Sequence, residues 1–247
     1  MTFTSPVSAA KSLGQGLSEI ITQAGIWTPR AKQVVIGPSE VGHDCTRRLA
    51  YKLLDWEKTN EMGSSNWSAQ VGSAIHKYLA DVFAKIEGYE VEQRVNIRGN
   101  LTGTIDLYDS VRGIVIDWKT TSPAAMERKR REGKNAQYHT QIQLYGYGKA
   151  QTGAPVNQVA LVYLPTSGGI DEMHIELYDY DESVALKGLE RMDNIHALLA
   201  QVDVEANPAM WEMIPAKPNR LCNYCPYFLP YSKDLSKGCF GETATRN

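Results

Sequence analysis

The chain has 247 residues, of which 43% are hydrophobic, and its formal net charge is −2. This length suffices for one large domain or two small ones with a packed core. The near-neutral charge does not itself indicate nucleic acid, the short apolar runs exclude a membrane-spanning helix, and the N-terminus lacks the pattern of a secretory signal. We therefore expect a cytoplasmic protein with no membrane partner.

Residues 1–37 are the least informative part of the chain. A helix is predicted over residues 8–24, where apolar residues recur at helical spacing, although Gly14 and Gly16 weaken it. We interpret residues 1–37 as a helical extension without an assigned function. Residues 38–247 are expected to form a single domain.

A second helix is predicted over residues 38–54, where Ser39 gives a capping signal. Cys45 lies within this segment and is followed by Arg47 and Arg48. A lone cysteine in a helix is usually a small core residue.

The strongest helical pattern of the first half covers residues 64–87. His76 lies at the edge of its apolar stripe, and Gly72, one turn earlier, would leave room beside the ring. A single histidine in such a place is more often a core residue than a ligand, so the pattern alone leaves both roles open.

Three strands follow, over residues 89–97, 101–108 and 113–118, the last two joined by a turn at residues 109–113. Val91, Val95 and Ile97 are expected on one face of the first strand. Asp117 and Lys119 project to one face of the third, because side chains alternate along a strand.

If Asp106 lies opposite them, two carboxylates and one ammonium group converge. Crowded carboxylates raise each other's pKa unless a cation lies between them, and Mg²⁺ or Mn²⁺ takes oxygen ligands. The lysine could then orient or deprotonate a water, which indicates phosphodiester cleavage. The alternative for this triplet is a solvated turn.

A basic segment, MERKRREGK, occupies residues 126–134. Arg128, Lys129, Arg130 and Arg131 are candidate DNA contacts on the way into the site, and phosphate binding would explain the cluster. A solvated charged face is the alternative.

The second half predicts a helix over residues 136–150 with Gln141 and Tyr145 on one face, strands over residues 156–164 and 172–177, and a long helix over residues 179–202. This order of elements indicates an α/β sheet with helices on its faces.

The C-terminal segment brings Cys222, Cys225 and Cys239, which with Cys45 account for all four cysteines. A C-x-x-C pair can place two thiolates on one metal centre. Four cysteines suit either zinc or an iron–sulphur cluster. The long gap before Cys239 makes His43 a reserve ligand.

The order helix-His, strand-Asp and strand-Asp-x-Lys, with GTID and IDWK at its core, resembles the PD-(D/E)XK nuclease superfamily, with Ile105 where that motif has proline. The Gly72–His76 spacing and the Gln141-x-x-x-Tyr145 pattern resemble its RecB-like branch. The cysteine pattern resembles the iron–sulphur CRISPR-associated exonucleases.

This resemblance implies a restriction-endonuclease-like mixed sheet flanked by helices, with a cysteine-ligated cluster joining the N- and C-terminal parts. It implies that Mn²⁺ or Mg²⁺ is held by His76, Asp106, Asp117 and the Trp118 carbonyl. Lys119 would assist the attacking water, and Gln141 and Tyr145 would position DNA. The four cysteines would hold a 4Fe–4S cluster, with zinc as the alternative.

The function implied is a divalent-metal-dependent DNA nuclease, expected to be an exonuclease on single-stranded DNA ends. Recombination, repair or CRISPR-type protein partners and oligomerisation are compatible with it. The alternative is a non-cleaving DNA-binding or scaffold protein of the same fold with a structural zinc.

Overall fold

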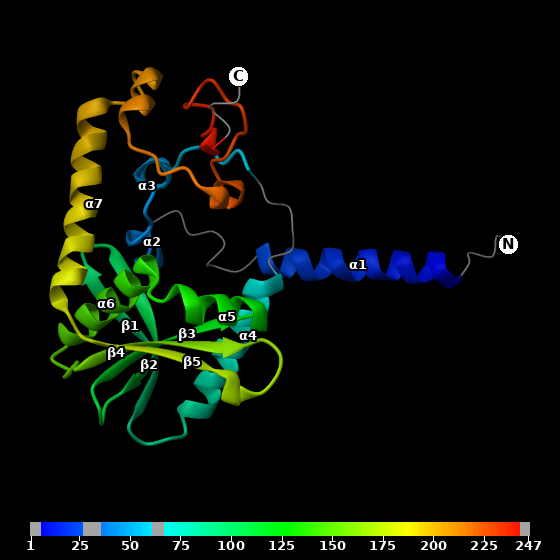
Figure 1. Ribbon diagram of the computed structural model, residues 1–247, viewed down its shortest axis with the longest axis vertical. Coiled ribbons are helices and arrows are strands. Elements are labelled where there is room, and N and C mark those ends of the chain that lie inside the picture. The colour runs from blue at the N-terminus through cyan, green and yellow to red at the C-terminus, as the bar shows by residue number, and fades with distance from the viewer. Residues whose placement is uncertain (1–5, 27–35, 61–66, 243–247) are drawn as a thin grey trace.

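The computed structural model describes residues 6–26, 36–60 and 67–242 and centres on a five-stranded mixed sheet of order β1-β2-β3-β4-β5 (Figure 1). The β3–β4 pair is parallel and the other neighbouring pairs are antiparallel. A parallel pair needs a crossover connection, and α5 and α6 supply it between β3 and β4. The strands are β1 (Tyr89–Arg98), β2 (Leu101–Asp109), β3 (Ile114–Thr121), β4 (Gln158–Pro165) and β5 (His174–Asp179).

Helices cover both faces of the sheet, as the sequence predicted. The helix α4 (Trp67–Phe83) lies on one face, where Ile75, Leu79 and Phe83 pack with buried residues of β2, β3 and β4. The larger core lies on the other face, beneath α6 (Ala136–Ala150) and α7 (Glu182–Val202). The short α5 (Pro123–Glu132) begins directly after β3.

The strand β1 differs from its expected alternation. Val91 packs on the α4 side of the sheet, whereas Val95 and Ile97 are buried on the α6 side. Glu92 has a φ of 50°, which interrupts the regular strand geometry between them. The prediction that all three residues share one face was therefore wrong.

The single helix expected over residues 38–54 is two helices, α2 (Pro38–Val41) and α3 (Thr46–Leu53). The chain turns at Gly42, where an added Cβ would lie 2.8 Å from the Cα of Gln137 in α6. This close approach of α2 to α6 requires glycine and ends the helix. Cys45 consequently has an extended conformation at the N-cap of α3 and does not lie inside a helix.

The C-terminal segment, with the 3₁₀ helices η3 (Pro208–Met213) and η4 (Arg220–Tyr224), packs around α3. Tyr51 is buried between Trp211 and Tyr227, with ring centroids 4.0 and 5.0 Å away. The Tyr51 hydroxyl donates to the Leu235 carbonyl, and Trp56 Nε1 donates to the Ser236 carbonyl. Residues near the two ends of the chain thus share one core.

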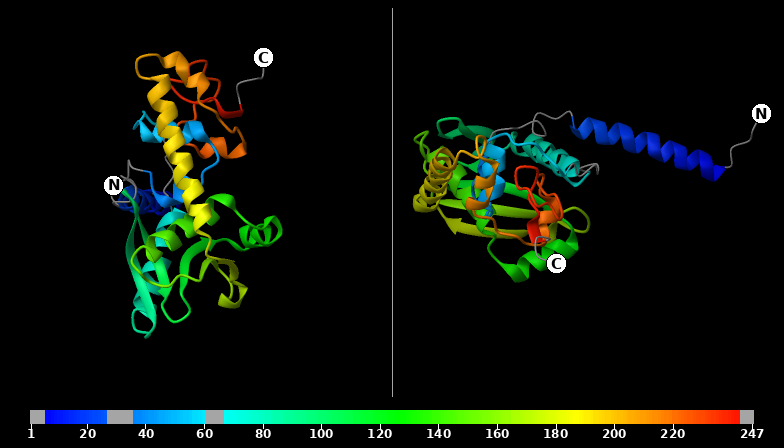
Figure 2. Two further views of the ribbon diagram at one scale, coloured as in Figure 1. Left: turned by 90° about the vertical axis from the view of Figure 1, so that its left-hand side faces the viewer. Right: turned by 90° about the horizontal axis from the view of Figure 1, so that it is seen from above.

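The first helix, α1 (Pro6–Ile26), extends away from the body in Figure 1 and in the right-hand view of Figure 2. It meets α4, where Gln70 Nε2 donates to the Ile21 carbonyl over 2.9 Å. None of the described helices is long and apolar enough to cross a membrane.

Candidate active site

A cleft of about 1250 Å³ opens between α4 and the β1–β2 hairpin. The α4 wall contributes Ser68, Ser73 and His76, and the β3 strand forms the base. Residues at that base and on the adjoining elements include Asp106, Asp117, Trp118, Lys119, Tyr138 and Tyr145. The structure therefore brings the acidic and basic residues singled out from the sequence into one concave site.

Asp106 lies where β2 and β3 separate. The ladder between these strands covers Leu107–Asp109 against Ile114–Ile116 and then ends. Beyond that point Asp106 Oδ2 accepts the backbone N–H of Trp118 over 2.8 Å. A side-chain carboxylate thus takes the place of a strand carbonyl, and the separation leaves room for side chains at the base of the cleft.

Asp117 is the most deeply buried carboxylate of the site, with 3% of its surface exposed. Its Oδ2 lies 2.6 Å from Lys119 Nζ, and its Oδ1 accepts from Gln141 Nε2 over 3.2 Å. Burial raises the pKa of Asp117, while the neighbouring Lys119 charge opposes the rise. The alternation of Asp117 and Lys119 onto one face occurs as the sequence predicted.

Gln141 connects the two halves of this ion pair. Lys119 Nζ donates to Gln141 Oε1 over 3.1 Å, while the Gln141 amide group donates to both Asp117 and Tyr145. Gln141 is only 1% exposed, so its amide is committed to these contacts in the free protein. In this structure the Gln141 amide therefore bonds to Lys119 and Asp117 and is not accessible to a ligand.

His76 reaches the site from α4, and its Nδ1 lies 3.2 Å from Asp106 Oδ1. Burial of the ring opposes protonation, but the hydrogen bond to Asp106 and the charges of Asp106 and Asp117 outweigh it and raise the His76 pKa. Gly72 does not make room for this ring as expected. An added Cβ there would lie 3.1 Å from Thr120 Oγ1, so this glycine lets α4 approach β3.

Tyr145 depends on a second glycine. A Cβ at Gly103 would lie 2.5 Å from Tyr145 Cε1, so the ring can occupy its place above β2 only because residue 103 has no side chain. The glycine of the GTID sequence therefore has a packing role. Ile105, the third residue of the GTID sequence, is fully buried in the core.

Comparison with known families places residues 39–228 within the model of the PD-(D/E)XK nuclease superfamily. The match covers most of the chain and includes every residue of the cleft base described above. The chain belongs to the PD-(D/E)XK nuclease superfamily. No curated protein sequence matches the chain.

The solved structures with a similar fold are distant in sequence from this chain. SSO0001 is 18% identical with a TM-score of 0.48, covering 87% of this chain and 94% of its own. LHK-Exo from Laribacter hongkongensis, in complex with dAMP, is 14% identical with a TM-score of 0.48 and coverages of 71% and 95%. A phage-related exonuclease from Haemophilus somnus 129PT is 17% identical with a TM-score of 0.44 and coverages of 66% and 82%. With TM-scores below 0.5, the family assignment rests on the sequence match.

The side chains at the cleft base of this PD-(D/E)XK superfamily member are of the types that bind a divalent cation. Asp117 Oδ2 is buried and accepts no hydrogen bond of normal geometry, although Lys119 Nζ stands close as its ion-pair partner. Carboxylate oxygens with one imidazole suit Mg²⁺ or Mn²⁺. Across the described residues, however, no group of three or more His, Cys, Asp or Glu side chains is arranged to hold a metal ion. His76 and Asp106 are instead bonded to each other.

Two cleft residues were not predicted from the sequence. Tyr138 lies with its ring 4.7 Å from Lys119 Nζ, a distance that permits a cation–π contact. Its position three residues before Gln141 on one helix face could have revealed it. Arg94 on β1 contacts Thr102 Oγ1 over 3.3 Å and faces the cleft from the hairpin. No sequence motif marks it.

The basic segment forms α5 and lies outside the residues that line the cleft. Lys129 pairs with Glu176 of β5 over 2.9 Å with both side chains nearly buried, so its charge is already compensated. Arg130 pairs with Glu127 and donates to the Glu172 carbonyl. Arg128 and Arg131 are exposed. Their contact with DNA stays a prediction.

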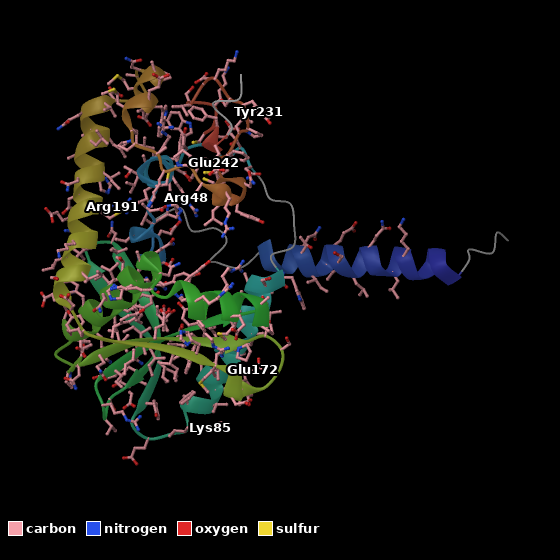
Figure 3. All side chains as sticks on the ribbon, in the orientation of Figure 1. Arg48, Lys85, Glu172, Arg191, Tyr231 and Glu242 are labelled. Carbon is pink, nitrogen blue, oxygen red and sulfur yellow. The ribbon has the colours of Figure 1, made fainter. Side chains whose placement is uncertain are left out.

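The four cysteines gather at the junction of α3 and the C-terminal segment and are not in disulfides. Burial raises the pKa of Cys222 and of Cys225, and the proximity of Cys45 and Cys239 adds to the rise for both. Cys222 and Cys225 therefore each lie within electrostatic range of Cys45 and Cys239. Among the described residues, however, no group of three or more His, Cys, Asp or Glu side chains is placed to hold a metal ion, so the predicted cysteine-ligated cluster is not shown. Arg48 and Glu242, labelled in Figure 3, are the charged neighbours of Cys225 and Cys222.

His43, the reserve ligand, is engaged by protein groups at this junction. Its Nδ1 accepts the backbone N–H of Cys45 over 3.1 Å, and Arg48 Nη1 lies 3.0 Å from its Nε2. Burial and the Arg48 charge lower the His43 pKa. The structure thus gives His43 a role in shaping the loop before Cys45.

Proposed function

We propose that this PD-(D/E)XK protein is a divalent-metal-dependent deoxyribonuclease. The observation that carries the proposal is the buried Asp117 carboxylate, joined to Lys119 and Gln141 and opposed by Asp106 at the base of an open cleft. Burying a charged carboxylate is costly unless a cation compensates it. A fold that retains such a group at a cleft base supports a chemical role for it.

His76, Asp106, Asp117 and the Trp118 carbonyl would hold Mg²⁺ or Mn²⁺. When bound, a divalent cation polarises the phosphoryl group and makes a hydroxide available near neutral pH. Asp106 also holds the Trp118 backbone in place through its N–H, which fixes the two strands relative to each other.

Lys119 is the group that would orient the attacking water. Lys119 lines the cleft together with Asp117, and its contacts with Asp117, Gln141 and the Tyr138 ring restrict the position of its ammonium group. Because Lys119 forms an ion pair with Asp117 and donates a hydrogen bond to Gln141, the lysine has a fixed direction before substrate arrives. Pre-set donors of this kind do not need to reorganise during the reaction.

Attack at the ends of single-stranded DNA is the finer part of the proposal. It rests on the likeness of the Gln141–Tyr145 pattern, and of the order of one upstream and three C-terminal cysteines, to RecB-like exonucleases. Cleavage of end-labelled linear and of circular single-stranded DNA, with Mn²⁺, with Mg²⁺ and with EDTA, tests both parts. We expect loss of linear DNA only, and only with metal.

Cleavage of circular DNA would overturn the exonuclease assignment alone. DNA binding without cleavage in any metal would overturn the nuclease proposal and favour a non-cleaving DNA-binding or scaffold protein. Asp117→Asn provides the matched inactive control, because it keeps the side-chain shape and removes the charge.

We also propose that Cys45, Cys222, Cys225 and Cys239 hold a structural metal centre, a 4Fe–4S cluster or, as the alternative, zinc. The electrostatic influence of Cys45 and Cys239 on both Cys222 and Cys225 supports it. Anaerobic purification followed by visible absorbance and by iron, sulphide and zinc analysis distinguishes the two. A protein with neither metal would overturn the proposal.

A further inference from the structure

The buried Asp117 carboxylate already has a cation of the chain's own against one of its oxygens. Lys119 Nζ lies 2.6 Å from Asp117 Oδ2, and the two side chains are 19% and 5% exposed. Within the described ranges of the chain, no hydrogen-bond donor of normal geometry reaches that oxygen. Burial of a charged carboxylate is tolerable only with a compensating cation. Lys119 therefore supplies the compensation that a divalent cation at the same oxygen would also supply.

Asp106 and His76 are bonded to each other in a way that leaves them able to bind a cation. Asp106 Oδ1 lies 3.2 Å from His76 Nδ1, and Asp106 Oδ2 accepts the Trp118 N–H over 2.8 Å. Each carboxylate oxygen has two lone pairs, so one remains on both oxygens. The contact with Asp106 uses His76 Nδ1, and the other ring nitrogen, Nε2, is a common metal donor. A cation could therefore bind these two side chains without breaking either bond.

Asp117 differs from them because its two oxygens have different partners. Oδ1 accepts from Gln141 Nε2 over 3.2 Å, and the Gln141 side chain is buried. Oδ2 has no hydrogen bond to lose, so it is the oxygen that a metal ion would take most easily, but the Lys119 ammonium is packed against it. Two cations beside one oxygen repel each other. Lys119 must leave Oδ2 before a divalent cation can bind there.

We infer that the Lys119 ammonium competes with a divalent cation for Asp117 Oδ2, so that Lys119 lowers the metal affinity of the cleft and is released from Asp117 when metal binds. The inference rests on the proposed metal-dependent nuclease function. It adds to that function an order of events, in which the lysine is neutralised by Asp117 until a metal ion takes its place.

Lys119 keeps two other partners when it leaves Asp117. Gln141 Oε1 accepts from Lys119 Nζ over 3.1 Å, and the centroid of the Tyr138 ring lies 4.7 Å from Nζ. An amide oxygen and an aromatic face both stabilise an ammonium group without neutralising its charge. Both partners belong to α6, so they do not depend on the Asp117 side chain. The lysine thus stays in the cleft with its charge available to a phosphate group.

Manganese binding in the absence of DNA tests the competition. Mn²⁺ is titrated at one fixed pH into the wild type and into Lys119→Met, which keeps the length of the side chain and removes its charge. We expect Lys119→Met to bind Mn²⁺ more tightly by about 10-fold, the scale on which groups beside metal ligands change metal affinity.

Lys77→Met is the matched control for removing a lysine from the cleft. Lys77 also lines the cleft and follows His76 directly on α4, but it is 81% exposed and pairs with Asp81 over 3.8 Å. Exposed charges are screened by solvent. This variant should therefore bind Mn²⁺ with the affinity of the wild type.

A second measurement uses the wild type, because Lys119→Met leaves a buried carboxylate without its cation and loses stability. In protein with isotope-labelled lysine, the ammonium signal of Lys119 is identified by its loss in Lys119→Arg and followed during titration with diamagnetic Mg²⁺. We expect it to shift in proportion to the Mg²⁺ bound. Lys149, which pairs with Glu90 over 2.6 Å and is 7% exposed, is the internal control and should not shift.

The outcomes separate this inference from the proposed function. Equal or weaker Mn²⁺ binding by Lys119→Met, or a Lys119 signal that does not shift at saturating Mg²⁺, would overturn the inference and leave the metal dependence in place. If neither the wild type nor Lys119→Met bound Mn²⁺, both the inference and the proposed metal dependence would be wrong. Binding by Lys119→Met alone would support the inference in its strongest form.

Discussion

The catalytic cleft and the cysteine junction are held together in different ways. In the cleft, Asp117, Lys119 and Gln141 contact one another directly on adjoining β3 and α6, within 25 residues of sequence. At the junction, α3 is joined to a segment more than 160 residues later, mostly by side chains that donate to carbonyl groups. The regular structure there is one short helix, two 3₁₀ helices and an isolated bridge between Phe228 and Cys239.

Because of this difference, we expect a metal bound in the cleft to affect catalysis and a metal bound at the cysteine junction to affect stability. The cleft is part of a sheet whose strands are fixed by their ladders, so changing its ligands should leave the fold intact. The junction closes nearly the whole chain into a loop, and a cross-link there restricts the unfolded chain. Four variants, each with a matched control, test this comparison.

Asp117→Asn is expected to have the largest effect, a fall in cleavage rate of about 10³-fold or more. It removes the buried charge while the sheet keeps its shape, so the melting temperature should not fall. The measurement is the single-turnover cleavage rate together with thermal unfolding. The comparison would break if this variant cleaved DNA at the wild-type rate.

Asp109→Asn, at the C-terminal end of the neighbouring strand β2, is the matched control. Asp109 is equally buried, but it accepts from the backbone N–H groups of Val111 and Arg112 in the turn. We expect this variant to be less stable, by about 1–3 kcal/mol from weakened buried hydrogen bonds, and still active.

Cys45→Ala should lower the melting temperature by about 10 °C. A cross-link over so long a loop contributes several kcal/mol to the free energy of unfolding, and each kcal/mol shifts the melting temperature of a chain of this size by about 2–4 °C. It should also remove the metal found in the wild type. The control is Asp44→Ala, which breaks an exposed ion pair of 3.0 Å with Lys217 across the same junction. Its effect should stay below about 4 °C. Equal melting temperatures for Cys45→Ala and the wild type would make Cys45 an ordinary packing residue.

Gln141→Ala should reduce the cleavage rate by about 10- to 100-fold, the usual cost of losing a group that orients a ligand residue. Lys119 would keep Asp117 but lose its second partner. Gln143→Ala, two residues along α6, removes contacts to the Asp179 carbonyl and the Asp181 N–H and should affect stability instead. A wild-type rate in Gln141→Ala would show that Asp117 alone positions the lysine.

Arg94→Ala should have the smallest effect, a weaker affinity for single-stranded DNA with a salt dependence reduced by about 0.7 in logarithmic slope. Arg128→Ala on α5 is the comparison, because it removes an exposed arginine outside the cleft. If both arginines contact phosphates, each variant lowers the slope. If the salt dependence falls only in Arg128→Ala, the DNA path lies over α5. If it falls only in Arg94→Ala, the DNA path is confined to the cleft.

Much of the fold could be predicted from local patterns. The strands around Asp106 and Asp117 and the helix carrying Gln141 lie within three residues of the predicted ranges, because alternation and helical spacing reflect burial directly. The misses have tertiary causes. Gly42 ends α2 because α6 approaches it, and Glu92 turns β1 over with a positive φ. Neither cause is visible in a local window.

For the candidate site too, the sequence predicted the features that depend on local alternation and missed those that depend on tertiary packing. Alternation predicted that Asp117 and Lys119 share a face, and the structure also brings His76 and Asp106 together. The bonds of Gln141 to both members of the ion pair depend on how α6 packs over β3, which no spacing rule specifies. The same packing brings Tyr138 to Lys119. Arg94 was missed because a single arginine on a strand has no distinguishing pattern.

The hydrogen bond between Asp106 and the Trp118 amide has a spectroscopic consequence. A backbone amide that donates to a carboxylate has a chemical shift sensitive to the charge on that oxygen. The exchange of this amide hydrogen with solvent is slowed by its hydrogen bond to the Asp106 side chain, because the β2–β3 ladder does not reach Trp118. Any proton or cation that occupies Asp106 Oδ2 must therefore alter the signal of a single residue. Isotope labelling of tryptophan would make Trp118 a reporter of events at the cleft base, readable without a DNA substrate.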